Sequence, residues 1–139
     1  MLKEILSISG KPGLQKLVSN SSNAIIVESL IDGKRFPAYS NSKIIALEDI
    51  SIYTEEEDMP LKEVFKRIYT KENGQSALSH KESSEKIIAY FNEIVPEYDK
   101  DRVYTSDMKK IIQWYNLLTE KGMLNFSEEE SKEENKEEK

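Results

Sequence analysis

Basic and aromatic side chains are interleaved in residues 100–121, and this combination could bind a charged or an apolar ligand. The segment contains five basic and three acidic residues, so it is locally basic in a chain whose net charge is -6. Lysine and arginine neutralise phosphates while aromatic rings stack on bases, which would suit nucleic acid. The same residue types also anchor protein interfaces. The candidate ligand-binding residues are Arg102, Tyr104, Lys109, Lys110 and Trp114.

The helix predicted from about residue 105 to Gly122 positions most of these side chains. At 100° per residue its core-facing arc contains Met108, Ile111, Ile112, Tyr115 and Leu118. Trp114 and Leu117 extend that arc on one side, where Lys110 and Lys121 flank them. Two interpretations of Trp114 stay open, because an aromatic residue beside an apolar stripe can be a core residue or part of an exposed patch.

A second basic stretch lies in residues 11–43, where five basic residues face two acidic ones. Lys34 and Arg35 are its candidate ligand-binding residues, since Phe36 and Tyr39 follow them closely. A charged, solvated strand face explains the same residues equally well, so this patch is the weaker of the two.

Residues for catalysis or for metal binding are scarce. The chain has no cysteine and a single histidine, which excludes disulfides, thiolate zinc sites, cysteine nucleophiles and multi-histidine metal sites within one chain. Three Ser-x-x-Lys pairs occur, as chance gives in a chain rich in both residues. Asp99, Asp101 and Asp107 could serve an enzyme, but nothing pairs a base with an orienting group. We therefore expect no enzymatic activity, no cofactor and no metal.

The elements before residue 58 are predicted to be short strands. Five β-prone runs are separated by turn residues, among them Asp32-Gly33, and Pro37 makes the third run an edge strand or a bulge. The runs span residues 13–19, 24–30, 34–40, 43–47 and 50–54. Five strands with tight turns predict a small five-stranded β-barrel, SH3-like or Tudor-like, as a module of residues 1–58.

A helical module is predicted over residues 59–126, because the apolar period changes to 3.6. The first helix spans about residues 60–70, with Pro60 at its first position. After a linker over residues 71–82, a second helix begins at a Ser83 or Ser84 cap and stops at Pro96. The third is the helix that ends at Gly122. The fold class is therefore α+β.

Residues 127–139 form an acidic tail with seven glutamates and three lysines, which carries four of the six net negative charges. Without apolar residues this segment is predicted to be disordered. The remaining body is nearly neutral, so the overall charge does not exclude nucleic acid as a ligand. No signal peptide or membrane-length apolar segment is present, which predicts a cytoplasmic protein.

Five sequence runs resemble a bacterial family known only as a domain of unknown function, and they are GKPGL (10–14), IVESL (26–30), LEDISIYT (47–54), PLKEV (60–64) and RVYTSDMKKIIQWYN (102–116). The resemblance covers about residues 1–124 and implies a small N-terminal β module followed by a C-terminal helical module. It implies no activity, cofactor or site residue. The residues themselves favour a non-enzymatic cytoplasmic binding protein with nucleic acid as its ligand. The alternative is an adaptor for another protein, with an apolar docking patch on the barrel or the last helix.

Overall fold

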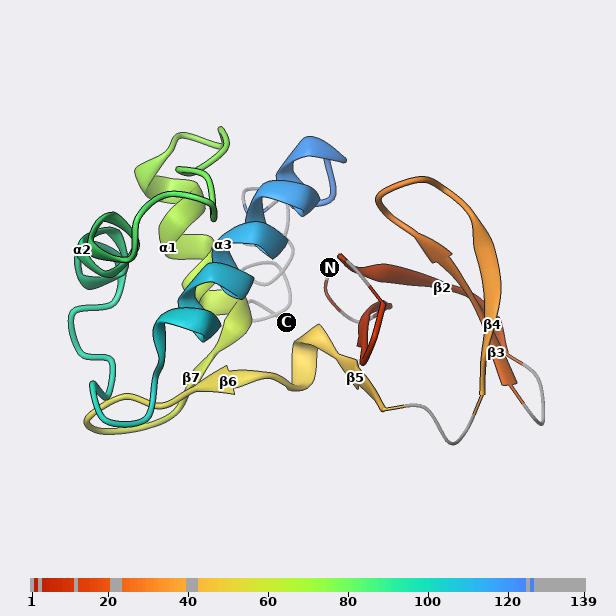
Figure 1. Cartoon of the computed structure of the whole chain (residues 1–139), viewed down its shortest axis with the longest axis horizontal. Coiled ribbons are helices and arrows are strands. Elements are labelled where there is room, and N and C mark those ends of the chain that lie inside the picture. The colour runs from red at the N-terminus through yellow and green to blue at the C-terminus, as the bar shows by residue number, and fades with distance from the viewer. Residues whose placement is uncertain are drawn as a thin grey trace, which may run out of the picture.

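The computed structural model describes residues 2, 4–11, 13–20, 24–39, 43–124 and 126, which form a β-sheet followed by a three-helix part (Figure 1). The predicted acidic tail over residues 127–139 lies outside the described residues. In chain order the elements are β1 (Ile5–Ile8), β2 (Gln15–Asn20), β3 (Ala24–Ser29), β4 (Arg35–Tyr39), β5 (Ile44–Ala46), the 3-10 turn η1 (Leu47–Asp49), β6 (Ser51–Ile52), β7 (Met59–Pro60), α1 (Leu61–Lys71), α2 (Ser84–Ile94) and α3 (Thr105–Glu120).

The main sheet is antiparallel and has the strand order β4-β3-β2-β1-β5. Strands β2 to β5 correspond to the first four predicted runs, but the sequence pattern missed β1. Ile5, Leu6 and Ile8 are all buried, so β1 lacks the alternation of apolar and polar residues by which a half-buried strand is recognised. The fifth predicted run, residues 50–54, lies outside this sheet, because β6 pairs with β7 instead.

The predicted closure into a barrel is wrong, whereas the α+β class is confirmed. Among the described residues, β4 and β5 lie at the two ends of the strand order and do not pair with each other. Pro37 in β4 has no N–H to give to a further strand, and β5 is only three residues long. The SH3-like or Tudor-like identity stays a prediction.

The two faces of the sheet belong to different apolar clusters. Adjacent residues of a strand point to opposite faces, so Ile5 joins the main core while Leu6 joins a smaller cluster with Ile8, Val27 and Ala38. The main core also contains Leu14 and Leu30 from the β part together with buried residues of all three helices. Among the described strands of the main sheet, only β1 contributes a buried residue to this core, through Ile5. The helices therefore pack against the β1 part of the sheet, and one hydrophobic core spans both parts of the chain.

The three predicted helices are confirmed, with ends set by local interactions. Ser83 caps α2 by accepting a hydrogen bond from the Lys86 N–H at 3.3 Å. The carboxylate of Asp107 accepts the Tyr104 N–H at 3.0 Å, and α3 begins at Thr105. Gly122 follows α3 with φ at +66°, the left-handed conformation that ends many helices.

The segment that connects α1 to α2 is held against α3 by side-chain hydrogen bonds. The Asn116 amide accepts the Ala77 N–H at 2.7 Å and donates to the Leu78 carbonyl at 3.0 Å. The Tyr115 hydroxyl donates to the Gln75 carbonyl at 2.8 Å. This predicted linker is therefore part of the helical packing.

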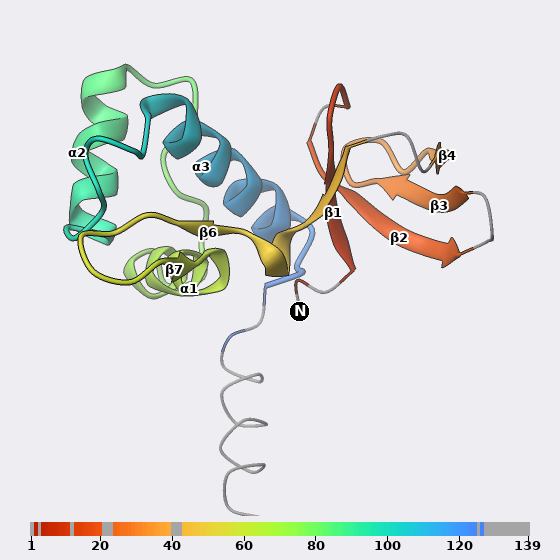
Figure 2. The ribbon, with the colours of Figure 1, turned by 90° about the horizontal axis from the view of Figure 1, so that it is seen from below.

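Strands β6 and β7 form a two-stranded ribbon on the helical side of the molecule, and β6 runs between α1 and α3 in Figure 2. The predicted boundary at residue 58 falls in the turn that joins these two strands. In the part of the chain that the structure describes, no helix is long and apolar enough to cross a membrane.

Candidate functional site

A groove of about 250 Å³ lies between β6 and α3. One wall is the extended segment that contains β6, the other wall is α3, and the turn that precedes α3 closes one end. The lining residues are Ile50, Ser51, Ile52, Tyr53, Arg102, Val103, Asp107, Lys110, Ile111 and Trp114. The groove thus contains three of the five candidate residues predicted in residues 100–121, namely Arg102, Lys110 and Trp114.

The apolar lining of the groove is continuous with the main core. Ile52, Val103 and Ile111 are buried, and Trp114 is half-buried and packs against the same core. Trp114 is therefore neither fully buried nor fully exposed: its ring contacts the core and also lines the groove. An apolar side chain of a ligand could be removed from water here.

Arg102 lies over the ring of Tyr53, with its guanidinium carbon 4.1 Å from the ring centroid. Its Nε also donates to the Asp99 carboxylate at 2.8 Å. This hydrogen bond raises the pKa of Arg102 and lowers the pKa of Asp99. The Arg102 charge is therefore matched by a carboxylate before any ligand binds.

Lys110 is an exposed cation at the groove, and among the described residues it has no ion-pair partner. Asp107 also lines the groove, where its carboxylate accepts the Tyr104 N–H. Opposite charges therefore balance along this wall, with Lys110 and Arg102 against Asp107 and Asp99.

The other predicted site residues lie outside the groove. Tyr104 is 64% exposed just before α3, and Lys109 is partly buried on a different side of the helix from Lys110. Lys34 and Arg35 lie on the sheet, where the Arg35 Nε is 3.1 Å from the Glu28 carboxylate. The structure therefore does not combine the two predicted basic patches into one site.

The sequence pattern missed the wall formed by residues 50–53, including Tyr53. These residues were predicted as a strand, but they were assigned to the barrel. The available signal was a hairpin: two short extended segments, Ser51–Ile52 and Met59–Pro60, flank the acidic run 55–58. Thr54 stabilises the connecting turn, because its hydroxyl donates to the Glu57 carbonyl and accepts the Glu56 N–H.

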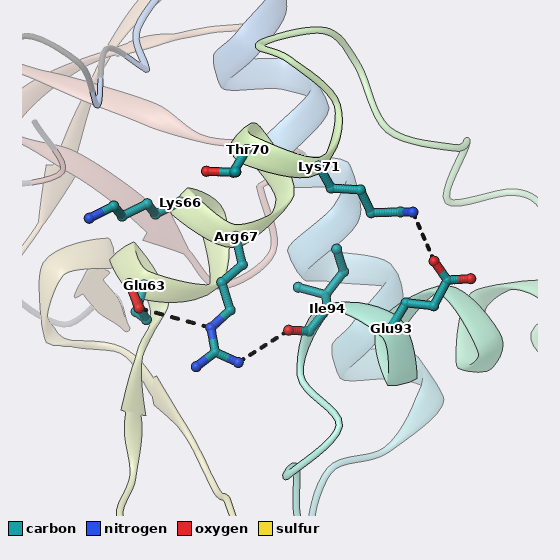
Figure 3. Close-up of a pocket in the computed structure, with 7 residues that line it drawn as sticks. All are labelled: Glu63, Lys66, Arg67, Thr70, Lys71, Glu93 and Ile94. Carbon is teal, nitrogen blue, oxygen red and sulfur yellow. Dashed lines mark hydrogen bonds and ion pairs between the residues drawn. The ribbon is translucent and has the colours of Figure 1, made fainter.

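A second depression of about 400 Å³ lies between α1 and the end of α2 (Figure 3). Arg67 donates to the Ile94 carbonyl at 3.2 Å and to the Glu97 carboxylate at 2.9 Å, which lowers the pKa of Glu97. Lys71 contacts Glu93 at 2.8 Å, and this hydrogen bond raises the pKa of Lys71. These charges hold α1 against α2, so we assign this depression to helix packing.

Metal chemistry has no structural support in the described part of the chain. Within residues 2, 4–11, 13–20, 24–39, 43–124 and 126, no three His, Asp or Glu side chains come together as metal ligands. The acidic run 55–58 forms the turn between β6 and β7.

These features define a small α+β protein in which an open antiparallel sheet is followed by a three-helix part with a groove on one side. Residues 2–47 match a family described as a domain of unknown function (DUF5606), and residues 50–118 match another described in the same way (DUF6852). The two matches meet at η1, so β6 belongs with the helices.

A protein from Bacteroides vulgatus, whose solution NMR structure was determined by the Northeast Structural Genomics Consortium, is 49% identical to this chain. The similarity covers 91% of each chain, with a TM-score of 0.74. The chain belongs to the same bacterial family of unknown function, which confirms the resemblance seen in the sequence. A comparison with curated proteins gave no match.

Proposed function

We propose that this protein is a non-enzymatic cytoplasmic adaptor that binds a segment of another protein in the groove between β6 and α3. The observation that carries the proposal is the composition of this groove. Buried Ile52, Val103 and Ile111 line it, and the rings of Tyr53 and Trp114 are partly accessible beside them. Apolar lining with aromatic residues and few charges is typical of the centre of a protein interface.

The charges around the groove favour a protein ligand over a polyanion. A surface for nucleic acid needs unmatched cations to replace the counterions of the phosphates. Here Arg102 is paired with Asp99, Asp107 lies on the same wall as Lys110, and the carboxylate of Asp58 also acts on Arg102. The groove therefore offers little net positive charge.

Nucleic acid is the second candidate, and a specific observation favours it. Tyr104 is 64% exposed near Arg102, and Trp114 provides a second partly accessible ring close to Lys110. Aromatic rings next to cations can hold single-stranded bases and phosphates.

Trp114 is the single tryptophan of the chain, so its fluorescence reports directly on the groove. We would titrate the full chain with peptides selected from a displayed random library and, separately, with single-stranded oligonucleotides. A protein ligand should change the Trp114 emission and keep its affinity within a few-fold between about 0.05 M and 0.2 M salt, because apolar burial is not screened.

The matched control is Lys109→Glu, which changes the charge of α3 outside the groove, compared with Lys110→Glu inside it. Weaker binding of selected peptides by Lys110→Glu alone supports the groove as the site. Peptides that leave Trp114 emission unchanged contradict the proposal. Oligonucleotide binding that falls steeply with salt and is weakened by Lys110→Glu would establish the second candidate instead.

A further inference from the structure

One edge of β6 pairs with β7 along the whole strand, whereas the opposite edge does not. Ser51 lies opposite Pro60 and Ile52 opposite Met59, and the Leu61 N–H donates to the Ile50 carbonyl at 2.9 Å. Alternate residues of an antiparallel strand direct their main-chain groups to the same neighbour. The Ile50 carbonyl and the main-chain groups of Ile52 therefore point to β7, while Ser51 and Tyr53 direct theirs to the opposite edge.

This opposite edge begins a second ladder that stops early. The Glu55 N–H donates to the Glu97 carbonyl and the Asp99 N–H donates to the Tyr53 carbonyl, both at 2.9 Å, around a bridge between Thr54 and Tyr98. Residues 97–99 thus lie antiparallel beside residues 53–55 at this isolated bridge. This pairing confirms that Tyr53 directs its carbonyl away from β7.

The ladder stops because the chain turns at Asp99. The Asp99 carbonyl accepts the N–H groups of Arg102 and Val103, at 3.2 and 2.9 Å, and the chain then enters α3. Residues 97–99 therefore do not extend beside Ser51, where the next residue of the antiparallel pairing would lie. Among the described residues, no residue outside the β6–β7 ribbon donates to or accepts from the main chain of Ser51.

The open stretch of edge lies in the groove, since Ser51 and Tyr53 line it together with Lys110 and Trp114 of α3. A strand edge with unpaired main-chain groups is a template for another extended chain. Peptides that add to such an edge gain affinity from main-chain hydrogen bonds and specificity from alternate side chains.

We propose that the ligand of this groove binds as an added β-strand: an extended peptide pairs antiparallel with Ser51, in line with residues 97–99, and directs an apolar and an acidic side chain toward α3. The inference rests on the proposed protein-binding function and specifies its mode and the chemistry of the partner. Antiparallel pairing lets one peptide residue bond both the N–H and the carbonyl of Ser51.

The side-chain preference follows from the two residues of α3 that face the strand. Lys110 and Trp114 are one helical turn apart, about 6 Å along the axis. Side chains two positions apart on an extended peptide are about 6.8 Å apart and share a face. One peptide can therefore place an apolar residue on Trp114 and a carboxylate on Lys110, which is the cation of the groove that lacks an ion-pair partner among the described residues.

The test compares Ser51→Pro with Ser51→Ala in the full chain. Proline removes the outward N–H without removing a bond to β7, and Ile50 before it has φ -91° and ψ 135°, an extended conformation that a following proline accepts. Alanine keeps the main chain and removes only the hydroxyl. We expect peptides selected on the wild type to bind Ser51→Pro about tenfold more weakly, as for a lost hydrogen bond, and Ser51→Ala within about twofold.

A second measurement leaves the protein unchanged and therefore does not depend on the folding of a variant. Single N-methyl groups are placed along the tightest-binding selected peptide, and each affinity is read from Trp114 emission. We expect a loss of about tenfold at the one position whose N–H bonds the Ser51 carbonyl, and little change at the two neighbouring positions.

The possible results separate the two proposals. Peptide binding that changes Trp114 emission but shows no loss confined to one N-methylated position, or equal affinities of Ser51→Pro and Ser51→Ala, overturns strand addition and leaves the protein-binding function standing. The absence of any selected peptide that changes Trp114 emission overturns both. Selected peptides without enrichment of acidic residues contradict the assigned role of Lys110.

Discussion

Replacing Leu14 with alanine tests whether the sheet and the helices unfold as one unit. Leu14 lies just before β2, is completely buried, and belongs to the same core as Phe65, Ile112 and Leu118. The Leu30 N–H also donates to the Leu14 carbonyl at 2.9 Å. This hydrogen bond joins the segment before β2 to the segment after β3. A cavity at Leu14 should therefore destabilise the helices as well as the sheet.

The expected loss is about 3 kcal/mol, since Leu→Ala at fully buried sites costs about 2–5 kcal/mol. For a domain of this size that corresponds to a melting temperature lower by roughly 10 °C. The measurement is thermal unfolding followed by Trp114 fluorescence, which reports on the helical part, and by far-ultraviolet circular dichroism, which reports on the whole chain. Both signals should shift together in Leu14→Ala.

The control is Ile45→Ala in β5, because that side chain is 51% exposed. Its removal should change the free energy of unfolding by less than about 0.5 kcal/mol, as for most surface substitutions. If Leu14→Ala leaves the Trp114 transition unchanged, or if the two signals give separate transitions, the sheet and helices are independent units and the shared core is an incorrect description.

Two further predictions concern the loop between α1 and α2. Asn116→Ala removes both hydrogen bonds that hold this loop to α3, so we expect a loss of about 1–2 kcal/mol and faster amide exchange in residues 75–78; unchanged exchange would contradict this role. Burial, followed by the hydrogen bond to Glu72, raises the pKa of Tyr90, so the folded state retains this proton more strongly than the unfolded state. The contribution of Tyr90 to the free energy of unfolding is complete below about pH 10, the pKa of a tyrosine in the unfolded chain. It is lost as the pH rises above that value. Tyr90→Phe should therefore have a flatter pH dependence of the unfolding free energy above about pH 10, and an identical dependence would refute the assignment.

The helices could be predicted because their determinants are local. The apolar stripe of residues 84–95, the cap at Ser83 and the stop at Pro96 lie within a few residues of one another, and the structure reproduces them. The pairing of strands is not local. β1 pairs with β5 from a distant part of the chain, and the short segment Ser51–Ile52 pairs with Met59–Pro60 rather than with the sheet. No periodicity within either segment identifies these partners.

The sequence predicted only part of the candidate site, because the other part depends on contacts between residues far apart in the chain. The spacing of residues on one helix placed Lys110 and Trp114 on neighbouring positions, and the structure places both in the groove. The sequence also indicated Lys109, which lies outside it, because a helical wheel does not show which flank of the core-facing arc a strand will approach. Tyr53 and Ser51 were missed because their position opposite α3 depends on the turn at Asp99.

The sequence alone determined the α+β class, the extents of the three helices, most of the strands and the family, since these depend on residues close together in the chain. Only the tertiary structure decided that the sheet stays open, that one core joins the sheet to the helices, and that β6 and α3 enclose a groove. These features arise from contacts between residues far apart in the chain, whose formation depends on the packing of all the elements together. The free β6 edge is the clearest case, because its exposure follows from two separate ladders meeting around residue 53.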